Sequence, residues 1–142
     1  MRKNVHEVLT EVGKITTKKS KIDLLRNADC PALKDILRIN FDDTIVSLLP
    51  EGAPPYRRDD APDGLNYSTL NRKMNYFAYF FKGKYTEMNQ VKREKMFAEI
   101  LEAVNQEDAE VFINAKDKNL KYKKKNWNCY NFICKFYLTY SM

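Results

Sequence analysis

The distribution of proline divides this chain into stretches that can be helical and one that cannot. Four of the five prolines lie between residues 50 and 62, and the fifth is Pro31. Proline breaks a helix interior because it lacks a backbone N–H and its ring clashes with the preceding turn. Residues 50–66 are therefore expected to form a long loop. Its stretch Pro54-Pro55-Tyr56-Arg57-Arg58 is expected to lie across the body or contact a partner, and a plain surface connection is the alternative. A loop of this length is unusual in a compact domain and is either functional or disordered.

Apolar side chains elsewhere recur every three or four residues, which is the spacing of an amphipathic helix. Thr16 or Thr17 is suited to cap the second of these stripes, and Pro31 fits the first position of the third. Val91 is expected to face the core. The helices predicted in this way cover residues 4–14, 18–27, 31–39, 67–81, 87–104 and 106–116, with a short additional helix capped by Asp42 or Asp43 and carrying residues 45–49.

The positive charge of the chain is concentrated near its C-terminal end. The formal net charge is +6, yet residues 118–142 contain six lysines and no acidic residue, so the preceding residues are neutral overall. We therefore expect an all-α protein with a single compact multi-helix domain, residues 1–117, and a basic, aromatic tail, residues 118–142. A basic segment on a neutral body suits a phosphate backbone or another anionic surface, and a solvated, partly disordered tail is the alternative.

The cysteines and the hydropathy pattern indicate a reducing compartment. The three cysteines, Cys30, Cys129 and Cys134, are an odd number in a chain without a secretory signal, which argues against a disulfide framework. No apolar run is long enough to span a membrane, so a cytoplasmic location without membrane contact is expected. With His6 as the only histidine, the Cys129 and Cys134 pair lacks the further ligands of a zinc site.

Catalytic motifs are missing from the sequence. It contains no glycine-rich phosphate loop, no Gly-x-Ser-x-Gly and no His-Glu-x-x-His. Its acidic pairs, such as Asp42-Asp43 and Asp59-Asp60, are adjacent along the chain and fit helix caps or loops better than a two-carboxylate site. We therefore expect a protein that is not an enzyme and uses no cofactor.

The junction between the first two predicted helices is the most specific binding feature. It brings hydroxyl and ammonium groups to a helix N-terminus, where unpaired backbone amides favour anions such as phosphate. Lysine binds phosphate as a point charge, so the contact would be to the backbone and not to bases. A capped helix with solvated lysines is the alternative. The residues of this junction are Lys14, Thr16, Thr17, Lys18, Lys19 and Lys21.

These residues belong to a longer pattern. The stretch Val8-Leu9-Thr10-Glu11-Val12-Gly13-Lys14-Ile15-Thr16-Thr17-Lys18-Lys19-Ser20-Lys21 resembles the opening of the N-terminal DNA-binding domain of ATP-dependent DNA ligases from T-even-type phages. The similarity continues through Leu24-Leu25, Leu33-Lys34 and Leu37-Arg38-Ile39-x-Phe41, and faintly at Asp117-Lys118-Asn119-Leu120.

The resemblance implies an all-helical domain that grips duplex DNA through its backbone, largely from the minor-groove side. Carried over by position, it implies phosphate contacts by Thr16, Thr17, Lys18 and Lys21, supported by Arg38. The nucleotidyltransferase domain with its adenylated lysine is absent, so ligation is not expected. The helix start that the family has after Leu120 is replaced here by Lys123-Lys124-Lys125.

The sequence thus predicts a non-catalytic accessory protein of phage type that binds duplex DNA without sequence preference. Two alternatives stay open: a protein-interaction or virion component that uses residues 50–66 or the tail, and a regulator of a host enzyme. The predicted DNA-contacting residues are Thr16, Thr17, Lys18, Lys19, Lys21, Arg38, Lys118, Lys121, Lys123, Lys124 and Lys125.

Overall fold

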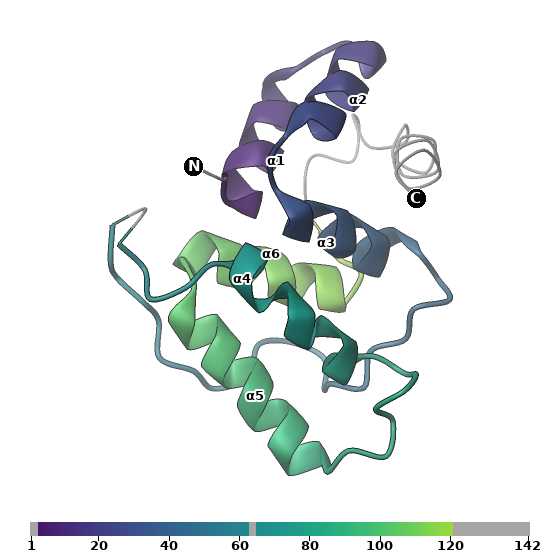
Figure 1. Cartoon of the computed structure of the whole chain (residues 1–142), viewed down its shortest axis with the longest axis vertical. Coiled ribbons are helices and arrows are strands. Elements are labelled where there is room, and N and C mark those ends of the chain that lie inside the picture. The colour runs from purple at the N-terminus through teal and green to yellow at the C-terminus, as the bar shows by residue number, and fades with distance from the viewer. Residues whose placement is uncertain (1–2, 63–64, 121–142) are drawn as a thin grey trace.

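A computed structural model describes residues 3–62 and 65–120, and the regular secondary structure in these ranges is helical (Figure 1). The all-α prediction is confirmed, and α1, α2, α3 and α6 lie within two residues of their expected bounds. The elements are α1 (Val5–Lys14), α2 (Lys18–Asn27), α3 (Pro31–Phe41), α4 (Leu70–Lys73), the 3₁₀ helix η1 (Met74–Phe80), α5 (Gln90–Ala103) and α6 (Gln106–Lys116).

Helix α6 lies at the centre of the domain and packs against α1, α3 and α5. The α1–α2 pair lies at one end of the molecule, and the N-terminal end of α5 lies at the other (Figure 1). Phe112 of α6 contacts Phe97 of α5 and Phe80 of η1, with ring centroids 5.1 and 6.1 Å apart in edge-on arrangements. Such pairs add to the hydrophobic free energy that buries these rings.

Both ends of α6 are stabilised locally. The Asn105 side chain accepts a hydrogen bond from the Glu107 amide at 2.8 Å, which caps the N-terminus. At the C-terminus the Lys118 amide donates to Ala115 at 3.0 Å and the Asn119 amide to Asn114 at 2.8 Å. Lys118 has a φ of 56°, so it occupies the left-handed position of a Schellman motif.

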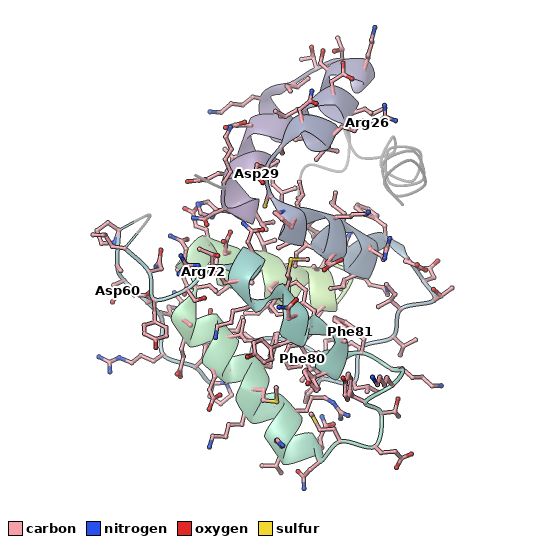
Figure 2. The ribbon with its side chains drawn as sticks, viewed as in Figure 1. Arg26, Asp29, Asp60, Arg72, Phe80 and Phe81 are labelled. Carbon is pink, nitrogen blue, oxygen red and sulfur yellow. The ribbon has the colours of Figure 1, made fainter. Side chains whose placement is uncertain are left out.

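The short helix expected over residues 45–49 is absent from the structure. These residues are not helical, and Ser47 forms an isolated antiparallel bridge with Phe81, which is labelled in Figure 2. The Leu48 amide donates to Phe80 at 2.9 Å, and the Lys82 amide donates to Val46 at 2.8 Å. The prediction was wrong because β-branched residues before a proline favour extended backbone, and this backbone finds a distant partner.

The aromatic helix expected over residues 67–81 is shorter and differently wound. Helix α4 begins at Leu70, capped by Thr69, and the chain then tightens into the 3₁₀ helix η1. Aromatic side chains have modest α-helix propensity, which weakens a sequence so rich in Tyr and Phe. The next helix, α5, begins at Gln90, and Val91 in its first turn is 74% exposed, so the prediction that Val91 faces the core was wrong.

The proline-rich segment is a loop, as predicted, and it lies across α5 and α6. The buried Lys116 ammonium donates to the Pro50 carbonyl at 2.9 Å. The Gly52 amide donates to the Asp117 carboxylate at 3.0 Å, and the Arg57 amide to Glu102 at 3.1 Å. These contacts hold residues 50–57 against the helical body.

Candidate nucleic-acid interface

The corner between α1 and α2 is exposed on its polar side and held in place on its apolar side. Lys14, Thr16, Thr17 and Lys19 are exposed. Val12 of α1 and Leu25 of α2 are buried nearby in the two paired helices. The corner is therefore a fixed surface feature, and the structure brings these four predicted residues together.

Within residues 3–62 and 65–120, no side chain accepts a hydrogen bond from the first-turn amides of α2. Thr17 has the extended backbone of an N-cap residue, but its side chain makes no capping hydrogen bond. The first turn of α2 also contains no acidic residue. Unpaired amides and the helix dipole give such an end a partial positive charge, which favours an anion.

In the other long helices, side chains accept hydrogen bonds from the first-turn amides. In α1 the His6 amide donates to Asp108 at 2.9 Å, and in α3 the Ala32 amide donates to Asn71 at 2.9 Å. Helices α5 and α6 are capped by Asn89 and Asn105. Among the helices of eight or more residues in the described ranges, α2 is thus the one whose first-turn amides lack a side-chain partner.

The two exposed lysines of the corner have no carboxylate partner in the described part of the chain. The nearby Glu11 carboxylate is paired with Lys3 at 2.8 Å. Lys14 and Lys19 are consequently available for an external anion. Lys18 begins α2, and its side chain lies outside the described part of the structure.

Lys21 does not belong to the exposed corner. Only 4% of its surface is exposed, although phosphate contact was predicted for it. Lys21 and the buried Leu25 are four residues apart and share one face of α2, and that face turns toward the body. Lys21 is therefore left out of the proposed contact surface, and its predicted phosphate contact stays a prediction.

Lys118 makes internal hydrogen bonds, and its predicted DNA contact stays a prediction. Its ammonium donates to the carbonyl oxygens of Ile39 at 2.9 Å and Asp42 at 2.6 Å. These carbonyls lie at the C-terminal end of α3, where unpaired acceptors and the helix dipole favour a cation. The Lys118 ammonium therefore stabilises the C-terminal end of α3.

Arg38 lies on α3 and is half-buried. It lines a depression of about 410 Å³ together with Lys34, Asp35 and Met74. Burial raises the pKa of the Asp35 carboxyl above its ordinary value, and the positive charges of Arg38 and Lys34 partly oppose that rise. Arg38 thus offsets a local negative charge, and its predicted support of DNA binding stays a prediction.

The tail lysines Lys121, Lys123, Lys124 and Lys125, together with Cys129 and Cys134, lie outside the described residues. Their predicted contacts therefore stay predictions.

A buried histidine–aspartate pair was not predicted from the sequence. His6 Nδ1 lies 2.7 Å from Asp108 Oδ1, and Glu107 Oε2 lies 3.4 Å from His6 Nε2. The His6 and Asp108 side chains are 6% and 1% exposed, which leaves them out of reach of a substrate. No group of three or more His, Cys, Asp and Glu side chains suited to a metal ion occurs in the described ranges. The pair joins α1 to α6.

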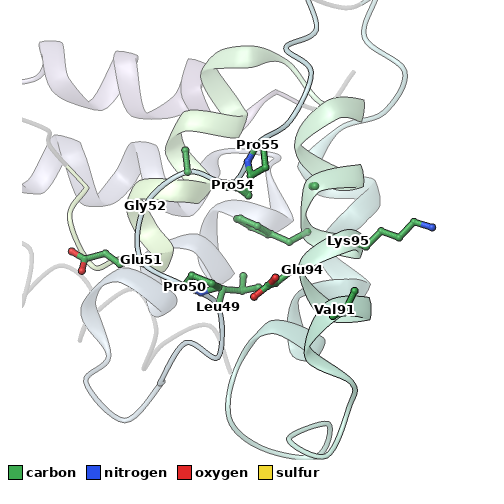
Figure 3. A pocket seen from close by; sticks show the side chains of 12 residues that line it. Leu49, Pro50, Glu51, Gly52, Pro54, Pro55, Val91, Glu94 and Lys95 are labelled. Atoms are coloured by element: carbon green, nitrogen blue, oxygen red, sulfur yellow. The ribbon is translucent and has the colours of Figure 1, made fainter.

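A groove of about 460 Å³ runs between the proline-rich loop and α5 (Figure 3). Leu49, Pro50, Pro54 and Val91 give it an apolar lining. Sequence reasoning missed this groove because it placed Val91 in the core.

Comparison with known proteins gives one match. A family model, described as a family of unknown function, DUF6433, matches residues 8–122. No curated protein and no solved structure matches the chain. In the described ranges no helix is both long and apolar enough to cross a membrane.

Proposed function

This chain belongs to DUF6433, a family of unknown function, and we propose that it binds duplex DNA through the phosphate backbone, without sequence preference and without catalysis. It would act as an accessory protein of phage type in the cytoplasm of the cell that contains the DNA. The α1–α2 corner is the proposed contact surface.

The observation that carries this proposal is the chemistry of the corner. Exposed hydroxyls at Thr16 and Thr17 and exposed ammonium groups at Lys14 and Lys19 surround the amides of α2 that no side chain caps. Phosphate oxygens accept hydrogen bonds from all three kinds of group. A surface of this kind favours a sugar-phosphate backbone over a base edge, because lysine and amide donors carry little base information.

The resemblance to the N-terminal domains of T-even-type phage ligases also supports the proposal. It implies phosphate contacts by Thr16, Thr17 and Lys18 at this corner, and by Lys21 on the same helix. An all-helical fold is also what the resemblance implies. The proposed contact set is therefore Lys14, Thr16, Thr17, Lys18 and Lys19, with the tail lysines from Lys121 to Lys125 as a proposed addition.

We expect the double substitution Lys14→Gln/Lys19→Gln to weaken duplex binding by about tenfold, because two phosphate-neutralising charges are lost. Fluorescence anisotropy with a labelled duplex of mixed sequence measures the effect. A second unrelated duplex should give the same loss, since the contacts are to the backbone.

The matched control is Lys92→Gln/Lys95→Gln, which removes the same charge from two exposed positions of α5. This control should keep most of the duplex affinity. Equal losses in both double variants would mean that net charge and not the corner attracts the duplex. Unchanged affinity in the Lys14/Lys19 variant would exclude the corner as the contact surface.

A protein-interaction role is the second candidate, and the groove beside α5 favours it. Val91 lies at this groove and is 74% exposed, which is unusual for a large apolar side chain next to other apolar residues. If the protein has no measurable affinity for duplex DNA at low salt, the protein-interaction role is favoured over DNA binding.

A further inference from the structure

A continuous surface of three tyrosine rings and two ammonium groups lies around η1 and the loop after it. We call it the tyrosine ladder. The Tyr79 ring centroid lies 6.3 Å from that of Tyr76 and 4.2 Å from that of Tyr85. The Lys73 ammonium lies 5.5 Å from the Tyr76 centroid, and the Lys84 ammonium lies 5.6 Å from the Tyr85 centroid. The ladder comprises Lys73, Tyr76, Tyr79, Tyr85 and Lys84.

The winding of η1 explains how the first two rings meet. A 3₁₀ helix has three residues per turn, so side chains three apart lie directly above one another. Tyr76 and Tyr79 have this spacing within η1 and stack at an interplanar angle of 29°. An α-helix would offset them around the axis. The unusual helix type thus creates the ladder.

The third ring is positioned by a buried arginine. Arg93 donates through Nε to the Tyr79 carbonyl and through Nη2 to the Tyr85 carbonyl, both at 2.9 Å. A hydrogen bond with the Tyr85 side chain also raises the pKa of the Tyr79 hydroxyl. The rings are therefore held in place before any ligand arrives.

The segment that carries the ladder is basic. Residues 65–86 contain four basic side chains and no acidic one, and Glu87 is the first carboxylate after them. Tyr76 is 43% exposed, while Tyr79 and Tyr85 are half-buried. The Tyr76 ring is thus partly open to solvent, with the Lys73 ammonium over it and the Tyr79 ring stacked against it.

We propose that the tyrosine ladder binds single-stranded nucleic acid, with a base stacked on Tyr76 and the phosphates near Lys73 and Lys84. Exposed aromatic rings interleaved with cations are the features that bind single strands without sequence preference, because every base has a flat π-face. The basic segment favours a polyanion over an apolar protein segment. In duplex DNA the bases are stacked on each other, so the rings select an unpaired strand.

This inference goes beyond the proposed duplex contact and does not depend on it. The α1–α2 corner and the loop after η1 lie at opposite ends of the molecule (Figure 1). Each surface can therefore be disabled without touching the other.

The test is anisotropy with a labelled oligothymidylate of about 16 nucleotides, which forms no duplex. Tyr76→Ala should weaken binding by about 5- to 100-fold, whereas Tyr76→Phe, which keeps the ring, should bind like the wild type. Tyr67→Ala is the matched control, because Tyr67 is 85% exposed but outside the ladder. Far-ultraviolet circular dichroism checks that each variant folds.

Three outcomes would overturn the inference: no binding of the oligothymidylate by the wild type, no loss in Tyr76→Ala, or an equal loss in Tyr67→Ala. The Lys14→Gln/Lys19→Gln variant separates the two surfaces, since its loss of oligothymidylate affinity should be smaller than that of Tyr76→Ala and smaller than its own loss of duplex affinity. If that variant instead loses oligothymidylate binding while Tyr76→Ala keeps it, the ladder is not the single-strand site.

Discussion

Replacing Arg93 with alanine is expected to lower the free energy of unfolding by about 3–5 kcal/mol. Arg93 is 3% exposed and donates to the carbonyl oxygens of Tyr79, Tyr85 and Thr86. It also donates to the Gln90 side chain. Truncation takes the arginine donor from these partly buried carbonyls, of which Tyr85 keeps the Met88 amide as a donor, and an unsatisfied buried group costs about 1–3 kcal/mol.

The loss should appear as a fall in melting temperature of roughly 10 °C in a thermal unfolding experiment. Lys92→Ala on the same helix is the control, because Lys92 is exposed and should change stability by less than about 0.5 kcal/mol. A melting temperature in Arg93→Ala equal to that of the control would contradict the structural role of Arg93. It would also remove the support that positions Tyr85 in the ladder.

Asp108→Ala is expected to destabilise the fold by about 3 kcal/mol. One oxygen of Asp108 accepts the His6 backbone N–H at 2.9 Å and lies 2.7 Å from His6 Nδ1. Its removal would take the acceptor from the first turn of α1 and leave buried polar atoms between α1 and α6. Chemical denaturation of the purified variant measures the change.

Glu107→Ala is the matched control for this prediction. Glu107 is the neighbouring carboxylate, but its side chain is 70% exposed, so its loss should cost well under 1 kcal/mol. Asp108→Asn, which keeps an acceptor oxygen, should fall between the wild type and Asp108→Ala. Equal stability of the two alanine variants would show that the buried pair contributes little.

The sequence predicted the helices whose apolar stripes are regular and whose starts carry a local signal, although Thr17 makes no capping hydrogen bond with its side chain. Thr17 and Pro31 mark the starts of α2 and α3, and such signals depend on neighbouring residues alone. The helix predicted over residues 45–49 is absent because their backbone partners, Phe80 and Lys82, lie far along the chain. Local spacing carries no information about such pairing.

The exposed residues of the α1–α2 corner could likewise be predicted from local sequence, whereas the surroundings of Lys21 and Lys118 were not. Lys14, Thr16, Thr17 and Lys19 are exposed where a helix junction places them. The burial of Lys21 follows from which face of α2 meets the body, and this face could have been found from its four-residue spacing to Leu25. The role of Lys118 depends on the end of α3, which is distant in sequence and close only after folding.

The tyrosine ladder could not be predicted from the spacing of residues along the sequence. Tyr76 and Tyr79 are in one predicted helix, but their stacking requires the tighter 3₁₀ winding. Tyr85 joins them through a loop held by Arg93. The sequence did nevertheless indicate a basic segment here, because residues 65–86 contain no acidic residue.

Duplex affinity measured at two salt concentrations tests the central claim most directly. If lysines and helix amides at the α1–α2 corner hold phosphates, the association constant of the wild type should fall by about 10- to 100-fold between about 50 and 200 mM salt. The slope of the logarithmic plot should become shallower in Lys14→Gln/Lys19→Gln. Absence of binding at the lower salt concentration, or an affinity that salt does not change, would contradict a phosphate-binding corner.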